Sequence, residues 1–95
     1  MKKFIYLAHG TMQRTPEFNE AHRAWWSSIQ GHVVDSGNPL FNGRDVTSGG
    51  AVTESAETVP PALGYSIVQA ESIEAAVSLL DTCPMDMWVY EAMPM

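Results

Sequence analysis

Hydrophobic and polar positions repeat with two different periods in the first third of the chain. Residues 3–8, KFIYLA, are rich in side chains that favour strands. A helix is predicted from Pro16, with Thr15 as its N-cap and Gly31 as its C-cap. The apolar stripe of this helix, with one serine included, consists of Phe18, Ala21, Trp25, Ser28 and Ile29. A short strand, HVVD, is predicted at 32–35.

The middle of the chain is rich in turn-forming residues and shows no clear hydrophobic periodicity. RDVT and AVTES flank the Ser-Gly-Gly at 48–50 and predict the two arms of a hairpin, within an insertion over 41–63. Pro60 and Pro61 exclude a central strand, because proline cannot donate to a strand ladder. We therefore expect a loop over 56–63.

The last third is again periodic. GYSIVQA, at 64–70, predicts a strand, and Ser72 is placed to cap a second helix. MWVYEA, at 87–92, predicts a final strand. The expected stripe of the second helix is Ile73, Ala76, Val77 and Leu80. Residues 1–95 thus predict one α+β domain of two strand–helix–strand units, a ferredoxin-like antiparallel sheet with both helices on one face.

Both faces of the terminal strands are apolar. An antiparallel sheet with one face open to water normally alternates apolar with polar side chains. Here the alternating sets are Phe4 and Tyr6 against Ile5 and Leu7, and Trp88 and Tyr90 against Met87 and Val89. The second face needs a cover, and the simplest cover is another copy of the same sheet, so we expect a homodimer.

Composition narrows the classes of function. The chain has 45% hydrophobic residues and a formal net charge of -6, with five Lys and Arg against eleven Asp and Glu. This balance argues against binding to nucleic acid or to anionic lipid. The apolar run after Lys2 and Lys3 is too short for a secretion signal, and no segment has the length of a membrane span. With Cys83 as the single cysteine, we expect a cytoplasmic protein.

The candidate chemistry lies in the first helix. His22 precedes Trp25 and Trp26 by three and four residues, and Asp35 ends the following strand. A histidine transfers protons near neutral pH, and a carboxylate beside it orients the ring. These residues predict a proton-transfer pair with an aromatic wall that stacks on a small planar ligand. The alternative is a structural histidine beside core tryptophans.

Two residues of the first strand are secondary candidates for ligand contact. They are Tyr6 and His9, of which His9 also fits a polar cap at the end of the strand. No pair of histidines has helical ligand spacing and no Cys-x-x-Cys is present, so neither a metal nor another cofactor is expected.

Five segments follow one another in an order that resembles a known family. They are FIYLAHG, EAHRAWW, GHVVDSGNPL, GYSIVQAESIEAAVSLLDTCP and the terminal VYEAMPM. Their order and spacing resemble the YCII-related proteins, including the DGPF-domain branch, over nearly the whole chain outside 41–63. The most specific piece is Gly64-Tyr65-Ser66-Ile67 with the helix entry Ala70-Glu71-Ser72 and the closing Cys83-Pro84. The Asp-Gly-Pro-Phe motif is absent, and the corresponding stretch reads TESAETVPP.

The resemblance implies a ferredoxin-like dimer whose paired sheets form an α/β barrel, with a cleft near the first helix of each subunit. His22 matches the histidine often present there. The turn at 36–40, SGNPL, resembles the small-Gly-x-Pro turn of the family and adds Pro39 to the candidate ligand contacts. Most members have no assigned activity, and the few enzymatic ones imply lyase or dehydrochlorinase-like chemistry on small ring compounds.

Three functions remain open from the sequence, and the structure around His22 separates them. A cofactor-free lyase or isomerase requires His22 in a solvent-connected cavity with an acidic oxygen in hydrogen-bond reach. A ligand-binding protein requires the cavity without that pairing. A purely structural domain has neither.

Overall fold

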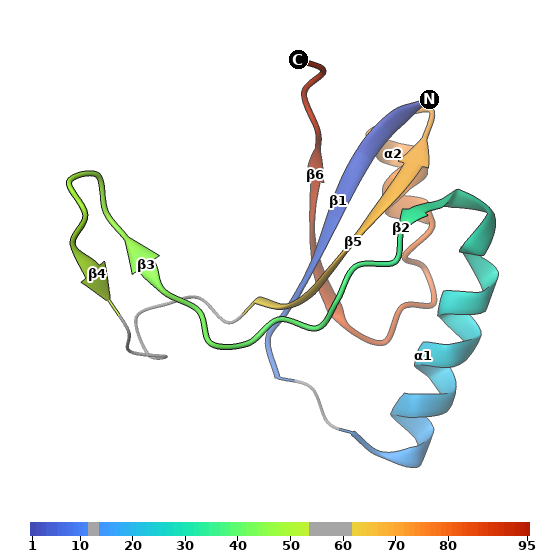
Figure 1. The fold of residues 1–95 in the computed structure, drawn as a ribbon. Coiled ribbons are helices and arrows are strands. Elements are labelled where there is room, and N and C mark those ends of the chain that lie inside the picture. Colours follow the sequence, from blue (N-terminus) through green and yellow to red (C-terminus); the bar gives the residue numbers. More distant parts are fainter. Residues whose placement is uncertain (12–13, 54–61) are drawn as a thin grey trace.

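The fold is built on an antiparallel sheet of four strands, in the order β2-β5-β1-β6 (Figure 1). The computed structural model describes residues 1–11, 14–53 and 62–95. The strands are β1 (Lys2–His9), β2 (Val33–Asp35), β5 (Ala62–Ala70) and β6 (Asp86–Glu91). Two helices complete an α+β domain compatible with the predicted ferredoxin-like fold. No helix in the described ranges is long and apolar enough to cross a membrane.

Both helices begin at the predicted caps. The Thr15 side chain accepts a hydrogen bond from the backbone N–H of Phe18 at 3.0 Å, and α1 (Pro16–Ser28) follows. The Ser72 hydroxyl accepts one from the N–H of Ala75 at 3.1 Å, at the start of α2 (Ile73–Ser78). Each cap satisfies a backbone donor that the first helical turn leaves without a partner.

The end of α1 differs from the prediction at Gly31. The C-cap is Ile29, and the chain tightens into a 3₁₀ turn, η1 (Gln30–His32), before β2 begins at Val33. Gly31 is not among the glycines with positive φ, so it does not use the left-handed conformation of a glycine C-cap. The i→i+3 bonds of the 3₁₀ turn replace that cap.

The core lies between one face of the sheet and the two helices. Its largest fully buried side chains are Trp25, Tyr6, Phe4, Ile29 and Val68. Trp25 also joins the helical layer together, because its indole N–H donates to the carbonyl of Leu79 after α2 at 2.8 Å. Burial removes the apolar surface of these side chains from water and supplies the main stabilising term.

The buried face of α2 was predicted only in part. Ala76 is fully buried and Leu80 packs against the core, but Ile73 and Val77 are 41% and 50% exposed. Ala75 and Leu79 pack in their place. A helix of six residues makes fewer than two turns, so its rotation is set by its connections and by contacts such as the Trp25 hydrogen bond.

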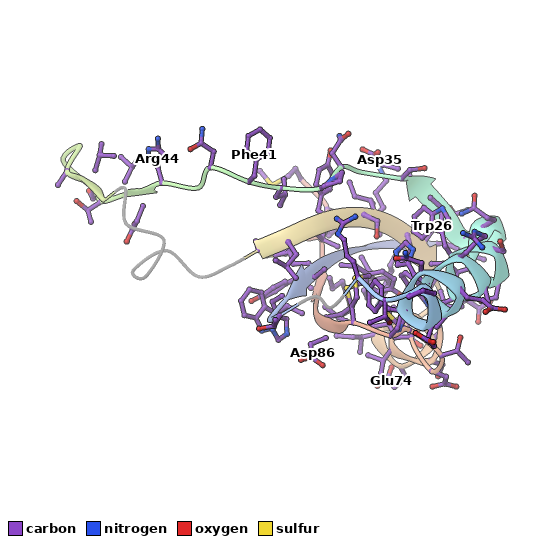
Figure 2. The ribbon with its side chains drawn as sticks, turned by 90° about the horizontal axis from the view of Figure 1, so that it is seen from below. Trp26, Asp35, Phe41, Arg44, Glu74 and Asp86 are labelled. Atoms are coloured by element: carbon purple, nitrogen blue, oxygen red, sulfur yellow. The ribbon has the colours of Figure 1, made fainter. Side chains whose placement is uncertain are left out.

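A two-stranded arm leaves the sheet after β2. Its strands are β3 (Asp45–Val46) and β4 (Val52–Thr53), which confirms the predicted hairpin. The arm is exposed along its length, and Figure 2 shows Phe41 and Arg44 on it away from the sheet. Of the predicted loop at 56–63, Ala62 and Leu63 belong to β5, and the rest lies outside the described residues.

Gly37 allows the turn between β2 and the arm to lie against β5. Its φ is +70°, and a Cβ built on it would lie 1.7 Å from the carbonyl oxygen of Tyr65. Beyond this contact the chain continues beside β5, with the Leu40 N–H bonded to the Leu63 carbonyl at 3.0 Å. Only glycine combines this backbone conformation with so close an approach.

We expect Gly37→Ala to lower the free energy of unfolding by about 1–3 kcal/mol, because it adds both strain and overlap. Urea denaturation measures the change. Gly31→Ala is the matched control: its Cβ would meet nothing within 4 Å, and we expect a change within about 0.5 kcal/mol. Equal effects of the two substitutions would contradict the close packing of the turn.

Candidate functional site

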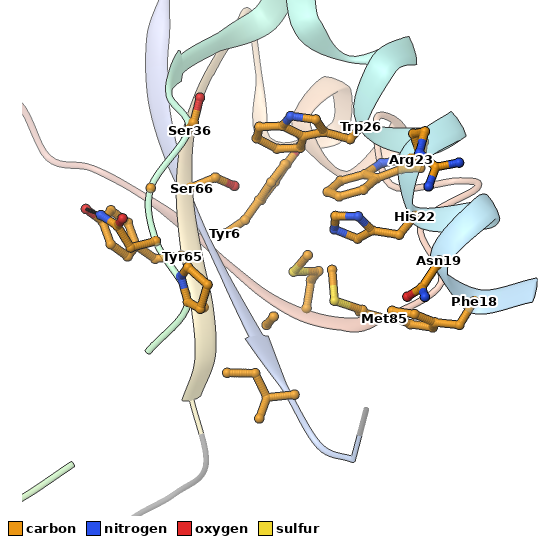
Figure 3. A pocket seen from close by; sticks show the side chains of 18 of the residues that line it. Tyr6, Phe18, Asn19, His22, Arg23, Trp26, Ser36, Tyr65, Ser66 and Met85 are labelled. Atoms are coloured by element: carbon orange, nitrogen blue, oxygen red, sulfur yellow. Dashed lines mark hydrogen bonds between the residues drawn. The ribbon is translucent and has the colours of Figure 1, made fainter. Parts of the chain in front are cut away.

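A pocket of about 620 Å³ lies between α1, the turn after β2, strand β5 and the segment that enters β6 (Figure 3). In Figure 3, His22, Arg23 and Trp26 come from α1, and Ser36, Tyr65 and Ser66 stand on the opposite side. The pocket lies on the helix-covered side of the sheet, because Ser66 pairs with the inward-facing Tyr6 across β1 and β5.

His22 stands between two aromatic rings on α1. Its ring centroid is 6.1 Å from that of Phe18, in a stacked arrangement, and 5.8 Å from that of Trp25, edge to face. The helical spacing of three and four residues places these rings on one face. His22 is half-buried and lines the pocket, so its ring can meet a bound molecule.

The pKa of His22 is lowered from its ordinary value of 6.5. The larger cause is burial, which disfavours the charged ring, and the smaller is the positive charge of Arg14. His22 is therefore neutral at neutral pH, with one ring nitrogen able to donate a hydrogen bond and the other able to accept one. Within the described residues it has no hydrogen-bond or ion-pair partner.

The structure does not bring Asp35 to His22. The Asp35 carboxylate accepts a hydrogen bond from the backbone N–H of Gly37 at 2.8 Å, and Asp35 is not among the residues that line the pocket. This contact closes the turn after β2 in the manner of an Asx turn. Asp35 thus holds the wall of the pocket and takes no direct part in it.

The aromatic residues predicted to form the wall have two different positions: two are buried beneath the pocket, and one presents its ring to the cavity. Tyr6 and Trp25 border the pocket but are 0% and 2% exposed, so they support it from beneath. The Tyr6 hydroxyl donates to the Ala76 carbonyl, and burial, with a smaller contribution from Cys83, raises the pKa of Tyr6 to about 12. Trp26, about 100° further around the helix, is only half-buried and presents its indole to the pocket.

The two remaining sequence candidates fall on different sides of the sheet. Pro39 lines the pocket, as predicted. His9 does not: its ring stacks on Trp88, with centroids 4.1 Å apart and an interplanar angle of 13°. The alternation of β1 places His9 on the face opposite Tyr6 and Ala8, away from the helices.

Most residues that line the pocket were not predicted from the sequence as site residues. They include Arg14, Phe18, Arg23 and Tyr65. A signal existed for Phe18 and Arg23, which share a helix with His22 and lie within one turn of it. No local pattern pointed to Arg14 or Tyr65, because only tertiary packing brings the loop before α1 and strand β5 to the same cavity.

Comparison of the chain with protein-family models, with curated proteins and with solved structures finds no match. The resemblance to the YCII-related proteins therefore stays a prediction from the residues. Across the described part of the chain, no cluster of three or more His, Cys, Asp or Glu side chains is placed to hold a metal ion.

We expect the pKa of His22, followed by NMR, to lie below 6.5. Arg14→Gln should raise it, because removing a nearby positive charge favours the protonated ring. Asp35→Asn is the control and should leave it unchanged, since the Asp35 carboxylate is turned to Gly37. A fall in the His22 pKa on Asp35→Asn would show that the two groups are coupled and would overturn this placement.

Proposed function

We propose that the protein binds a small planar organic molecule in the pocket beside α1. The observation that carries the proposal is the pocket itself: a solvent-connected cavity with aromatic side chains in its wall and the neutral His22 among its polar groups. Small-molecule sites are concave and mostly apolar, with a few polar groups that fix orientation. The cleft implied by the resemblance to YCII-related proteins supports the same assignment.

The position of Asp35 favours binding over catalysis. A histidine that acts as a general base is normally oriented by a partner, and among the described residues His22 has none. The core residues beneath the pocket are tightly packed, yet the side chains of the described residues do not fill the space above them. A purely structural role accounts for the packed floor but not for the open cavity.

The proposal is tested by titrating the protein with planar aromatic probes and following the tryptophan indole N–H signals by NMR. We expect the Trp26 signal to shift, and the Trp88 signal, on the opposite face, to stay in place. Trp26→Ala should weaken binding by about 0.5–1.5 kcal/mol, the value of one aromatic stacking contact. Trp88→Ala is the matched control and should retain the affinity.

Two outcomes would contradict a binding pocket. One is the absence of any shift with neutral and anionic probes alike up to millimolar concentration. The other is an equal loss of affinity in Trp26→Ala and Trp88→Ala, which would place the probes elsewhere.

A second candidate function is cofactor-free elimination or isomerisation with His22 as general base. It is favoured by one observation, the lowered pKa of His22, which keeps a proton-accepting nitrogen available at neutral pH. His22→Gln separates the two functions. It abolishes turnover of any substrate if His22 moves a proton, whereas the glutamine amide can still donate a hydrogen bond to a bound ligand.

We also propose that the chain forms a homodimer through the face of the sheet that carries no helix. This face, named here the open face, bears Ile5, Leu7, Tyr65, Ile67, Trp88 and Tyr90. Trp88 and Tyr90 are 37% and 56% exposed, although both are large and apolar. A contiguous aromatic and aliphatic surface of this kind is typical of an interface between subunits.

Light scattering at micromolar concentration tests the dimer, and we expect twice the mass of one chain. Tyr90→Lys, which places a charge on the open face, should shift the protein towards monomer. Val77→Lys is the control, because Val77 is similarly exposed, at 50%, but lies on α2. A folded wild-type monomer, or equal dissociation by both variants, would contradict the interface.

A further inference from the structure

We propose that the ligand of the pocket is an organic anion, a planar aromatic carboxylate, held by Arg14 and Arg23. The proposal rests on the proposed function, since it names the class of molecule that the same pocket takes. Its basis is the charge at the cavity, which is positive although the net charge of the whole chain is negative.

The chain is acidic, but the lining of the pocket is not. The whole chain has five Lys and Arg and a formal net charge of -6. Two of the five, Arg14 and Arg23, line the pocket, and among the described residues of its lining there is no Asp or Glu. The acidic surface of the chain as a whole repels anions. The two arginines at the pocket create a local positive field, which favours an anion inside the cavity.

Within the described residues, Arg14 and Arg23 form no salt bridge or hydrogen bond through their side chains that would stabilise the fold. The salt bridge found there joins Lys2 to Glu91, 3.9 Å apart, and neither of these residues lines the pocket. No hydrogen bond is formed by the guanidinium of Arg14 or Arg23 with another described residue. Because both residues are exposed, their guanidinium groups remain hydrated and are able to turn towards a bound molecule.

The two arginines reach the pocket from different parts of the chain. Arg14 lies in the segment that leads into α1, and Arg23 lies on α1 directly after His22. A guanidinium matches a carboxylate through two parallel N–H···O bonds. Trp26, from α1, supplies a flat surface for the ring of the same molecule. The neutral His22 completes the set as a hydrogen-bond donor.

The positive charge at the pocket also acts on His22. Arg14 contributes to the lowered pKa of this ring, after the larger effect of burial. The charge of Arg14 is thus felt at the position where a ligand would lie. A carboxylate bound there would offset this charge, and the pKa of His22 would rise on binding.

The experiment compares 2-naphthoate with 2-naphthamide, which share a ring system and differ in charge. Affinities are measured by NMR from the indole N–H signal of Trp26. We expect naphthoate to bind about tenfold more tightly than naphthamide, and this ratio to fall as salt is added. Arg14→Gln and Arg23→Gln should each lower the affinity for naphthoate several-fold while leaving that for naphthamide unchanged.

Arg44→Gln is the matched control. It removes the same charge from the arm, which lies away from the pocket, and should leave both affinities as they are. If it lowers the affinity for naphthoate as much as the pocket variants do, net charge alone explains the preference and the proposal fails.

The remaining outcomes separate this proposal from the proposed function. Equal binding of the two probes at Trp26 would overturn the anion proposal and leave the ligand pocket in place. Binding of neither probe would overturn both. A preference for naphthoate that is unchanged in Arg14→Gln and Arg23→Gln would assign the anion to other groups and overturn the proposal as stated.

Discussion

The burial of Trp25 is the contact on which the pocket depends. Its indole fills the space between the sheet and the two helices, and its N–H donates to the Leu79 carbonyl, which ties α1 to the end of α2. With Trp25 fixed, the rotation of α1 is fixed as well. Trp26 then faces the cavity beside the core, and His22, one turn earlier, lies against the edge of Trp25. One buried side chain therefore decides which face of the helix meets a ligand.

The opposite wall depends on a backbone contact. Gly37 lets the turn after β2 approach the Tyr65 carbonyl, and the Asp35 carboxylate closes that turn through the Gly37 N–H. The chain then continues alongside β5, and the Asn38 carbonyl accepts a hydrogen bond from the Tyr65 N–H at 3.2 Å. Asp35, which was expected to orient His22, thus lies away from it and instead stabilises the turn that forms the wall opposite α1.

The sheet separates two surfaces with different chemistry. The helix-covered side holds the pocket, with its arginines and the neutral histidine. The open face carries aromatic and aliphatic side chains, and His9 belongs to it through its stacking on Trp88. Because side chains alternate along β1, neighbouring residues of one strand serve these two surfaces. A substitution in β1 therefore affects the pocket floor if the side chain faces the helices, and the open face if the side chain points the other way.

The sequence by itself determined the strands, the N-caps of both helices, the hairpin and the apolar character of both sheet faces, because each depends on side chains close together in the chain. It also singled out His22 and Trp26. The end of α1, the exposed positions of α2 and the turn of Asp35 towards Gly37 were decided by the tertiary structure. So was the meeting of Arg14 and Tyr65 at one cavity. The physical reason is that caps and alternation are local interactions, whereas the rotation of a short helix and the direction of a polar side chain depend on long-range packing.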